Sequence, residues 1–304
     1  MQTTHSEART SETPTTPTHL WRSPMLGTPR TLTLRQGTLQ YFERGDGPAL
    51  VFAHGWLANA NLWRRVVDAL ADRFRCITLD LPFGSHRIAL DPGADLTPPG
   101  CGALIADAID ALGLSAATLV GNDSGGCYSQ IATAARPQRI ARLVLNSCET
   151  IDDAFPPEAF ALLPQAAQSP QGLRQLLTPL EDRSIRMTPA AYGLLLKRPI
   201  DDLAFDSYAL PCLRDDLVLR DATKVMSSAS AVALHEAGLR LIADFDRPVL
   251  FAWSPEDQVF PVEKAKAYAT RLKQGRVALI DDAYSFTPED QPQALARAIA
   301  TFAA

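Results

Sequence analysis

The chain has 304 residues, of which 46% are hydrophobic and 21% charged, and its formal net charge is −5. These values fit one α/β domain with an insertion and a sizeable core. The acidic balance and the lack of a Lys/Arg run argue against binding to nucleic acid or acidic membranes, and no apolar run reaches membrane-spanning length. Five scattered cysteines without C-x-x-C spacing are typical of reduced, buried thiols in a cytoplasmic protein.

The N-terminal residues 1–26 are rich in Thr, Ser and Pro. Such a segment buries too little apolar surface to order itself, so we predict a disordered leader. It lacks the apolar h-region of a signal peptide.

After the leader, strand and helix patterns alternate along the chain. Residues 31–45 predict a β-hairpin that turns at Gly37. Short continuous apolar runs are typical of strands buried in a parallel sheet, whereas apolar residues at helical spacing indicate helices. These patterns predict strands at 49–55, 75–82, 117–123 and 141–147, and helices at 60–72, 102–114 and 125–135.

The alternation is interrupted over residues 149–228, where short helical patterns are broken by prolines, which are Pro156, Pro157, Pro164, Pro170, Pro179, Pro189, Pro199 and Pro211. We interpret this segment as a helical cap inserted into a core domain made of residues 27–148 and 229–304. The second part of the core predicts helices at 230–245, 261–273 and 292–302, and strands at 248–253 and 276–282. Alternating β and α elements indicate a mostly parallel, doubly wound sheet, which binds ligands beyond the carboxyl ends of its strands.

The stretch "LVGNDSGG" (119–126) has the pattern of a tight strand-to-helix turn that exposes one residue above the sheet. Sterics require small residues two positions before and after the tip. Gly121 and Gly125 satisfy this for Asp123, whereas Ser124 at the tip would need Asn122 to be small. A glycine-rich phosphate loop is the alternative, but neither G-x-G-x-x-G nor G-x-x-x-x-G-K is present. We therefore predict a nucleophile elbow with Asp123 at its tip.

Four motifs make residues 30–304 resemble the α/β-hydrolase fold, specifically the aspartate-nucleophile branch of epoxide hydrolases and haloalkane dehalogenases. They are "HGW" (54–56), "GNDSGG" (121–126), "WSPEDQVFP" (253–261) and "FTPEDQP" (286–292). The resemblance implies an α/β fold with an inserted helical cap. It also implies hydrolysis of a small molecule through an alkyl-ester intermediate, without a metal or cofactor.

Carried over from that family, each motif supplies one role. Asp123 becomes the nucleophile, and Asp257 the acid that orients a histidine. The oxyanion donors become the backbone N–H groups of Trp56 and Ser124. His54 is expected beside the substrate site, where it holds the oxyanion loop by hydrogen bonds.

The family's histidine slot is occupied here by Ser285, and the last histidine in the chain is His235. Attack by Asp123 needs only a reactive carbon and a leaving group. Hydrolysis of the resulting ester needs a base near pKa 7, and a serine hydroxyl is not one. The sequence therefore supports a nucleophile elbow better than it supports hydrolysis.

Four explanations of this departure remain open. His86, in the loop after the strand that ends near Leu81, replaces the missing base. The fold performs non-hydrolytic acid/base chemistry, as a lyase, isomerase or cyclase. The protein binds a small molecule without turnover. Ser285 is an introduced substitution that traps the covalent intermediate.

The cap is expected to set substrate choice. In epoxide hydrolases, cap tyrosines donate hydrogen bonds to the epoxide oxygen, and Tyr192 and Tyr208 are the candidates here. Haloalkane dehalogenases hold the halide with a Trp directly after the nucleophile, a position that is Ser124 in this chain. We therefore expect a small, largely apolar epoxide or ester in preference to a haloalkane. The expected partner is that substrate alone, with the protein a monomer or homodimer.

Overall fold

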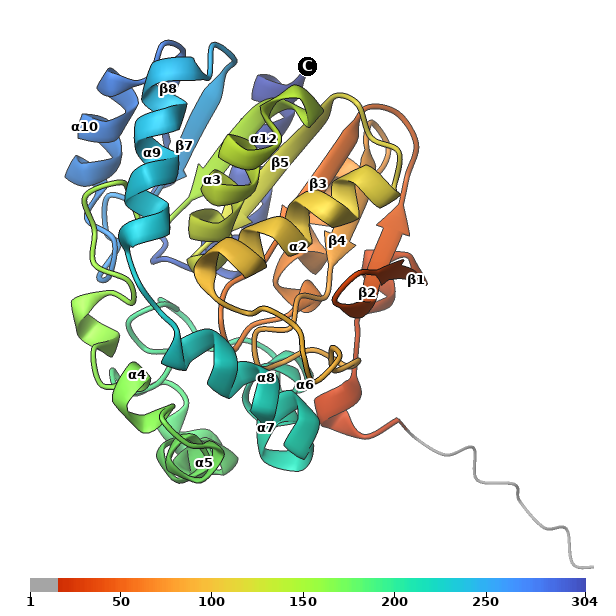
Figure 1. Cartoon of the computed structure of the whole chain (residues 1–304), viewed down its shortest axis with the longest axis vertical. Helices are drawn as coiled ribbons and strands as arrows, with labels where there is room; N and C mark the ends of the chain where they lie inside the picture. Colours follow the sequence, from red (N-terminus) through yellow and green to blue (C-terminus); the bar gives the residue numbers. More distant parts are fainter. Residues whose placement is uncertain (1–15) are drawn as a thin grey trace, which may run out of the picture.

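The computed structural model describes residues 16–304 and shows an eight-stranded sheet in the order β1-β2-β4-β3-β5-β6-β7-β8 (Figure 1). The β1–β2 and β2–β4 pairs are antiparallel, and the other neighbours are parallel. The strands are β1 (Thr28–Leu34), β2 (Gly37–Arg44), β3 (Ala49–Ala53), β4 (Arg75–Leu79), β5 (Ala117–Asn122), β6 (Ile140–Asn146), β7 (Val249–Trp253) and β8 (Gly275–Leu279). The predicted mostly parallel α/β sheet is confirmed.

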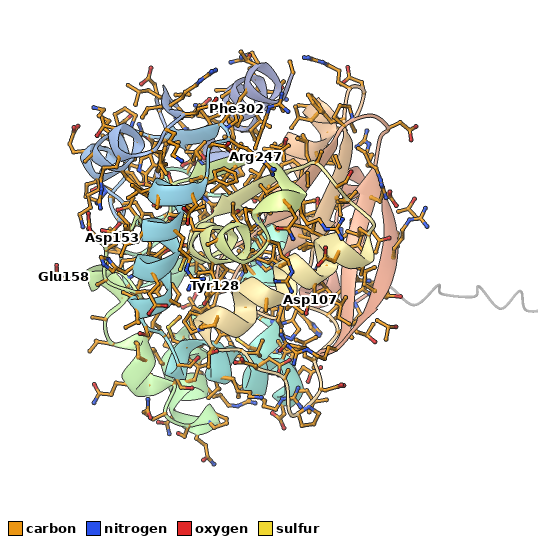
Figure 2. All side chains as sticks on the ribbon, turned by 45° about the horizontal axis from the view of Figure 1, so that its top comes forward. Asp107, Tyr128, Asp153, Glu158, Arg247 and Phe302 are labelled. Atoms are coloured by element: carbon orange, nitrogen blue, oxygen red, sulfur yellow. The ribbon has the colours of Figure 1, made fainter. Side chains whose placement is uncertain are left out.

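Core helices cover both faces of the sheet. α2, α3 and α9 pack side by side on the face turned toward the viewer in Figure 1, and α1 packs against α12 behind the sheet. Tyr128 of α3 lies in the interior (Figure 2), where it contacts the rings of Phe83 and Phe155. The core helices are α1 (Arg64–Leu70), α2 (Pro98–Ala111), α3 (Ser124–Ala135), α9 (Val232–Asp244), α10 (Val262–Arg271), α11 (Thr287–Asp290) and α12 (Pro292–Ala303).

Two predicted helices differ at their starts. The helix predicted from residue 102 begins at Pro98, because the side chain of Thr97 accepts the Gly100 N–H and proline suits the first helical turn. The helix predicted from residue 60 opens with a 3₁₀ turn, which the Asn59 side chain caps.

The segment predicted as a cap lies beyond the carboxyl ends of the strands (Figure 1). Short helices fill it because prolines recur at or near their first positions. Asp153 and Glu158, which precede these helices, lie at the edge of the molecule (Figure 2). The cap helices are α4 (Leu163–Ala166), α5 (Pro170–Leu177), α6 (Asp202–Ala209), α7 (Pro211–Arg214) and α8 (Asp216–Ser227).

The predicted disordered leader needs correction in its second half. Residues 1–15 lie outside the described residues, but residues 16–26 are ordered and form 3₁₀ turns at Thr18–Leu20 and Pro24–Leu26. Arg22 forms a buried ion pair with Asp80, with Nη2 2.9 Å from Oδ2, and the Ser23 N–H donates to Asn61. A composition-based prediction misses these long-range partners.

All five cysteines are buried and free of disulfides, as expected. Burial raises the pKa of each thiol. Among residues 16–304, no helix is both long and apolar enough to cross a membrane.

Candidate active site

Asp123 occupies the tight turn between β5 and α3, with φ 54° and ψ −143°. Two neighbouring positions accept no side chain. A Cβ on Gly121 would lie 2.6 Å from the Gly125 carbonyl oxygen, and one on Gly125 would lie 2.6 Å from the Ala53 carbonyl oxygen. The glycines therefore let β5 and α3 close around the turn, and the elbow geometry expected for Asp123 is present.

Strained backbone gathers at this edge of the sheet. Among residues 16–304, four non-glycine residues have positive φ, and three of them, Leu57, Asp123 and Ser147, follow β3, β5 and β6. The Asp123 N–H donates to the Ser147 carbonyl at 2.9 Å, which joins two of these turns. Such conformations persist where the surrounding structure enforces them, and they cluster at functional sites.

A cavity of about 420 Å³ lies between this edge and the cap. Its polar side chains are few, and they come from Asp123, Ser124, Glu149 and Tyr192. An apolar chamber with a few convergent polar groups is typical of a small-molecule site. The apolar walls are Trp56, Leu57, Phe155, Pro156, Pro157, Ala159, Phe160, Leu162, Leu163, Leu176, Leu177, Pro179, Leu180, Ile185, Ala190, Ala191, Leu195 and Met226.

Two carboxyl groups meet in this chamber. Burial raises the pKa of Asp123 to about 6, while the hydrogen bonds from Ser124 oppose the rise. Burial raises the pKa of Glu149 well above its usual range, and the charge of Asp123 adds to that shift. Two buried carboxyl groups that repel one another ionise in sequence, and the larger upward shift of Glu149 makes Asp123 the first to lose its proton.

The two predicted oxyanion donors make different contacts. The Ser124 N–H donates to Asp123 Oδ1. The Trp56 N–H instead donates to the Ser124 hydroxyl oxygen at 2.8 Å. Both groups lie beside the elbow, but the Ser124 hydroxyl separates the Trp56 N–H from the Asp123 carboxylate.

Ser285 and Asp257 are neighbours, as their motifs imply. The Ser285 hydroxyl donates to Asp257 Oδ1 at 2.7 Å. The same oxygen accepts the N–H groups of Val259 and Phe260, each at 2.9 Å. Burial raises the pKa of Asp257, although these bonds oppose the rise. Neither Ser285 nor Asp257 lines the cavity.

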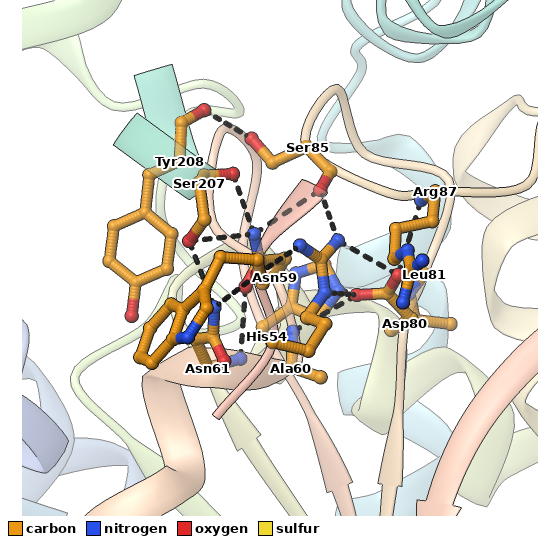
Figure 3. Close-up of polar contacts among 12 residues, drawn as sticks. His54, Asn59, Ala60, Asn61, Asp80, Leu81, Ser85, Arg87, Ser207 and Tyr208 are labelled. Carbon is orange, nitrogen blue, oxygen red and sulfur yellow. Dashed lines mark hydrogen bonds and ion pairs between the residues drawn. The ribbon is translucent and has the colours of Figure 1, made fainter. Parts of the chain in front are cut away.

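His54 directly follows β3 and belongs to the polar network of Figure 3. Its Nε2 accepts the Leu81 N–H at 2.9 Å, and Nδ1 lies 2.9 Å from the Gly55 carbonyl oxygen. Burial lowers the pKa of His54 to about 4, so the ring is neutral and uses both nitrogens internally. It does not line the cavity, and its contacts are those of a residue that holds the loop.

His86 is buried away from the cavity walls. Its Nε2 lies 3.3 Å from Asp221 Oδ2 on α8. The structure gives no support to His86 as the base that replaces the missing histidine, because its one polar contact is with a cap residue outside the chamber.

The two cap tyrosines are placed differently. Tyr192 lines the cavity, but its hydroxyl donates to the Leu57 carbonyl at 2.9 Å. Tyr208 lies outside the cavity, and its hydroxyl donates to Glu289 Oε1 at 2.7 Å. Both hydroxyls donate to acceptors of the protein itself. These contacts therefore do not support the expected role of the two tyrosines as hydrogen-bond donors to a substrate.

Comparisons with known proteins agree with this geometry. A family model described as "alpha/beta hydrolase fold" matches residues 48–292. The chain belongs to the α/β-hydrolase fold family. A solved structure, an α/β-hydrolase fold protein from Burkholderia ambifaria, superposes with a TM-score of 0.75 at 22% identity, covering 89% of this chain and 96% of the other.

Several curated relatives of this α/β-hydrolase carry hydrolase names. The chain is 25% identical to the uncharacterized hydrolase YugF of Bacillus subtilis, over 88% of this chain and 94% of that protein. Shorter matches are 37% identical to an epoxide hydrolase of Caballeronia sordidicola (34% of this chain, 31% of that protein) and 31% identical to haloalkane dehalogenase 2 of Mycobacterium tuberculosis (37% and 39%).

Glu149 is the functional candidate of this α/β-hydrolase that sequence reasoning missed. It stands three residues beyond the end of β6, so its position at the carboxyl edge of the sheet was a usable signal. Over residues 16–304, no cluster of His, Cys, Asp and Glu has the arrangement of a metal site.

Proposed function

We propose that this α/β-hydrolase cleaves a small, largely apolar electrophile by attack of the Asp123 carboxylate. The observation that carries the proposal is the strained tip position of Asp123, which opens into an apolar cavity. With a pKa of about 6, the carboxylate is ionised at neutral pH and, in a largely apolar chamber, only weakly solvated. Weak solvation raises the reactivity of a carboxylate toward carbon.

In the proposed reaction, an Asp123 oxygen bonds to the electrophilic carbon as the bond to the leaving group breaks. The product is an alkyl ester of Asp123. Water then adds to the ester carbonyl, and the Ser124 N–H is placed to stabilise the charge that develops there. Release of the alcohol regenerates the carboxylate.

Substrates with an oxygen leaving group fit the chamber better than haloalkanes. Ser124 stands directly after Asp123, where a haloalkane dehalogenase supplies an indole N–H, and the Trp56 indole N–H points to the Ala222 carbonyl. The hydrolase relatives favour turnover over lyase, isomerase or cyclase chemistry and over binding alone.

The test is intact-mass analysis of the protein incubated with a panel of epoxides, activated esters and alkyl halides, combined with assays of product. We expect turnover or an adduct that maps to Asp123, with both lost in Asp123→Asn. The amide retains the hydrogen bond from Ser124 but is a far weaker nucleophile. Neither adduct nor product from any member of the panel would overturn the proposal.

A further inference from the structure

Glu149 has no part in the attack described so far, yet it is built into the same chamber. The residue is 1% exposed and lines the cavity with Asp123. Within the described part of the chain, its Oε2 has no hydrogen-bond partner and no cationic side chain pairs with it. A buried carboxyl group without a partner is costly unless it is protonated, and such groups concentrate at functional sites.

The other polar groups of the chamber already donate their protons in hydrogen bonds within the protein. The Tyr192 hydroxyl and the Trp56 indole N–H each donate to a backbone carbonyl. The Trp56 backbone N–H donates to Ser124, whose own N–H and hydroxyl are directed to Asp123. Among residues 16–304, Glu149 is therefore the one cavity-lining group that has a titratable proton free to transfer to a substrate.

We propose that Glu149 is the acid–base residue of this site and that an epoxide is its substrate class. The inference rests on the proposed attack by Asp123. A halide leaves without a proton. When an epoxide ring opens, its oxygen becomes a strongly basic alkoxide, and a carboxylic acid beside that oxygen lowers the barrier by donating a proton.

The proton balance is complete without a histidine. Asp123 attacks a ring carbon, the carbon–oxygen bond breaks, and the alkoxide takes the Glu149 proton. The resulting Glu149 carboxylate then accepts a proton from water as the hydroxide adds to the Asp123 ester carbonyl. The tetrahedral intermediate expels the diol oxygen, which takes the proton of the new Asp123 carboxylic acid. Asp123 ends ionised and Glu149 ends protonated, as they began.

The electrostatic surroundings suit this exchange. Around Glu149 the charged neighbours are the carboxylates of Asp123 and Asp153, both of which oppose its ionisation. Asp153 is itself paired with Lys264 of α10, which moderates its effect. The other titratable groups near the two cavity carboxyls are neutral at pH 7, because burial raises their pKa values, and they are Cys127, Tyr128, Cys148 and Tyr192. Asp257 adds to the shift of Asp123.

The test compares styrene oxide with phenethyl bromide. The two carry the same aryl group, but the leaving group of the first is an alkoxide and that of the second is bromide. For Glu149→Gln, we expect the ratio of the epoxide to the bromide rate of Asp123 alkylation to fall at least ~100-fold. The epoxide-derived ester should also persist in this variant but turn over in the wild type, where Glu149 has become a carboxylate by giving up its proton. The matched control is Glu236→Gln on the exposed surface of α9, which makes the same chemical change and should alter neither rate.

The pH profile supplies a second readout. Epoxide opening should rise with pH through about 6 as Asp123 ionises, and fall at higher pH as Glu149 loses its proton. Glu149→Gln should lose the alkaline fall but keep the acid rise, and Glu149→Asp should restore part of the rate. Infrared difference spectra at pH 7 should show a protonated carboxyl band that is absent from Glu149→Gln.

Three results would overturn the assignment. An equal loss of both rates would show that Glu149 only supports the fold of the site. Absence of the protonated carboxyl band would show that Glu149 is ionised and has no proton to give. Alkylation by the bromide but not by the epoxide would retain the attack by Asp123 and reject the epoxide. Absence of adduct and product with both probes would instead remove the proposed function on which the inference depends.

Discussion

At the scale of single residues, the position of Ser285 defines what the site lacks. Its hydroxyl donates to Asp257 Oδ1, the bond that an imidazole N–H would make in a triad. In the proposed site, Asp257 therefore has a serine hydroxyl as its partner where the resemblance implies an imidazole.

This arrangement predicts a gain of function for Ser285→His. An imidazole oriented by Asp257 and directed at the Asp123 ester should raise the rate of ester hydrolysis at least ~10-fold, a modest share of what general bases contribute. The measurement is the decay of the covalent adduct by intact mass, with circular dichroism to check folding. The double variant Ser285→His/Asp257→Asn should lose the gain. Unchanged decay in a folded Ser285→His protein would show that position 285 does not face the ester.

At the scale of elements, the β5–α3 turn depends on close packing of backbone. Gly121 faces the Gly125 carbonyl, the Gly126 Cα and the Ser129 hydroxyl, all at 2.6 Å from an added Cβ. Two of these three atoms belong to the backbone of α3, so a side chain at Gly121 would require the helix itself to move. The small residue at this position is therefore a condition for the geometry of the elbow.

We expect Gly121→Ala to lower the free energy of unfolding by about 1–3 kcal/mol, the usual cost of overpacking. It should also slow alkylation of Asp123, because α3 must shift. Thermal denaturation and the alkylation rate measure the two effects. Gly93→Ala is the matched control, since a Cβ there meets nothing within 4 Å. Equal stability of the two variants would contradict this account.

At the scale of the whole molecule, a buried polar network ties the cap to the core. Arg64 of α1 pairs with Glu289 of α11 and, at 2.6 Å, with Asp201 at the start of α6. The Tyr208 hydroxyl of α6 donates to the same Glu289. The cavity lies between the bodies that this network joins, so its shape depends on groups that no substrate touches.

Tyr208→Phe tests whether this network stabilises the fold without taking part in the reaction. Loss of one buried hydrogen bond to a charged group should lower the free energy of unfolding by about 1.5–3 kcal/mol. The rate of epoxide opening should not change, because Tyr208 does not line the cavity. A variant of normal stability with a much lower rate would instead support the role as a substrate donor that the sequence suggested. Denaturant titration and single-turnover kinetics distinguish the two outcomes.

The sequence predicted the sheet and the turn at Asp123, because both depend on local patterns. Apolar runs marked the buried strands, and two glycines marked the tip at Asp123. Glu149 escaped notice because the residue it meets in the chamber, Asp123, is distant in sequence. The same reason explains Arg22, whose partner Asp80 orders a segment that composition predicts to be disordered. Long-range partners decided both cases.

The burial of the five cysteines has a practical consequence for chemical labelling. Thiolate, rather than thiol, is the form that reacts with carbon electrophiles. With all five thiols buried and their pKa values raised, this chain offers alkylating reagents little competing thiolate near neutral pH. A native protein carrying one added mass is therefore a selective reporter of carboxylate chemistry. Dyes that carry an epoxide can then serve as activity probes for this chain without prior removal of its cysteines.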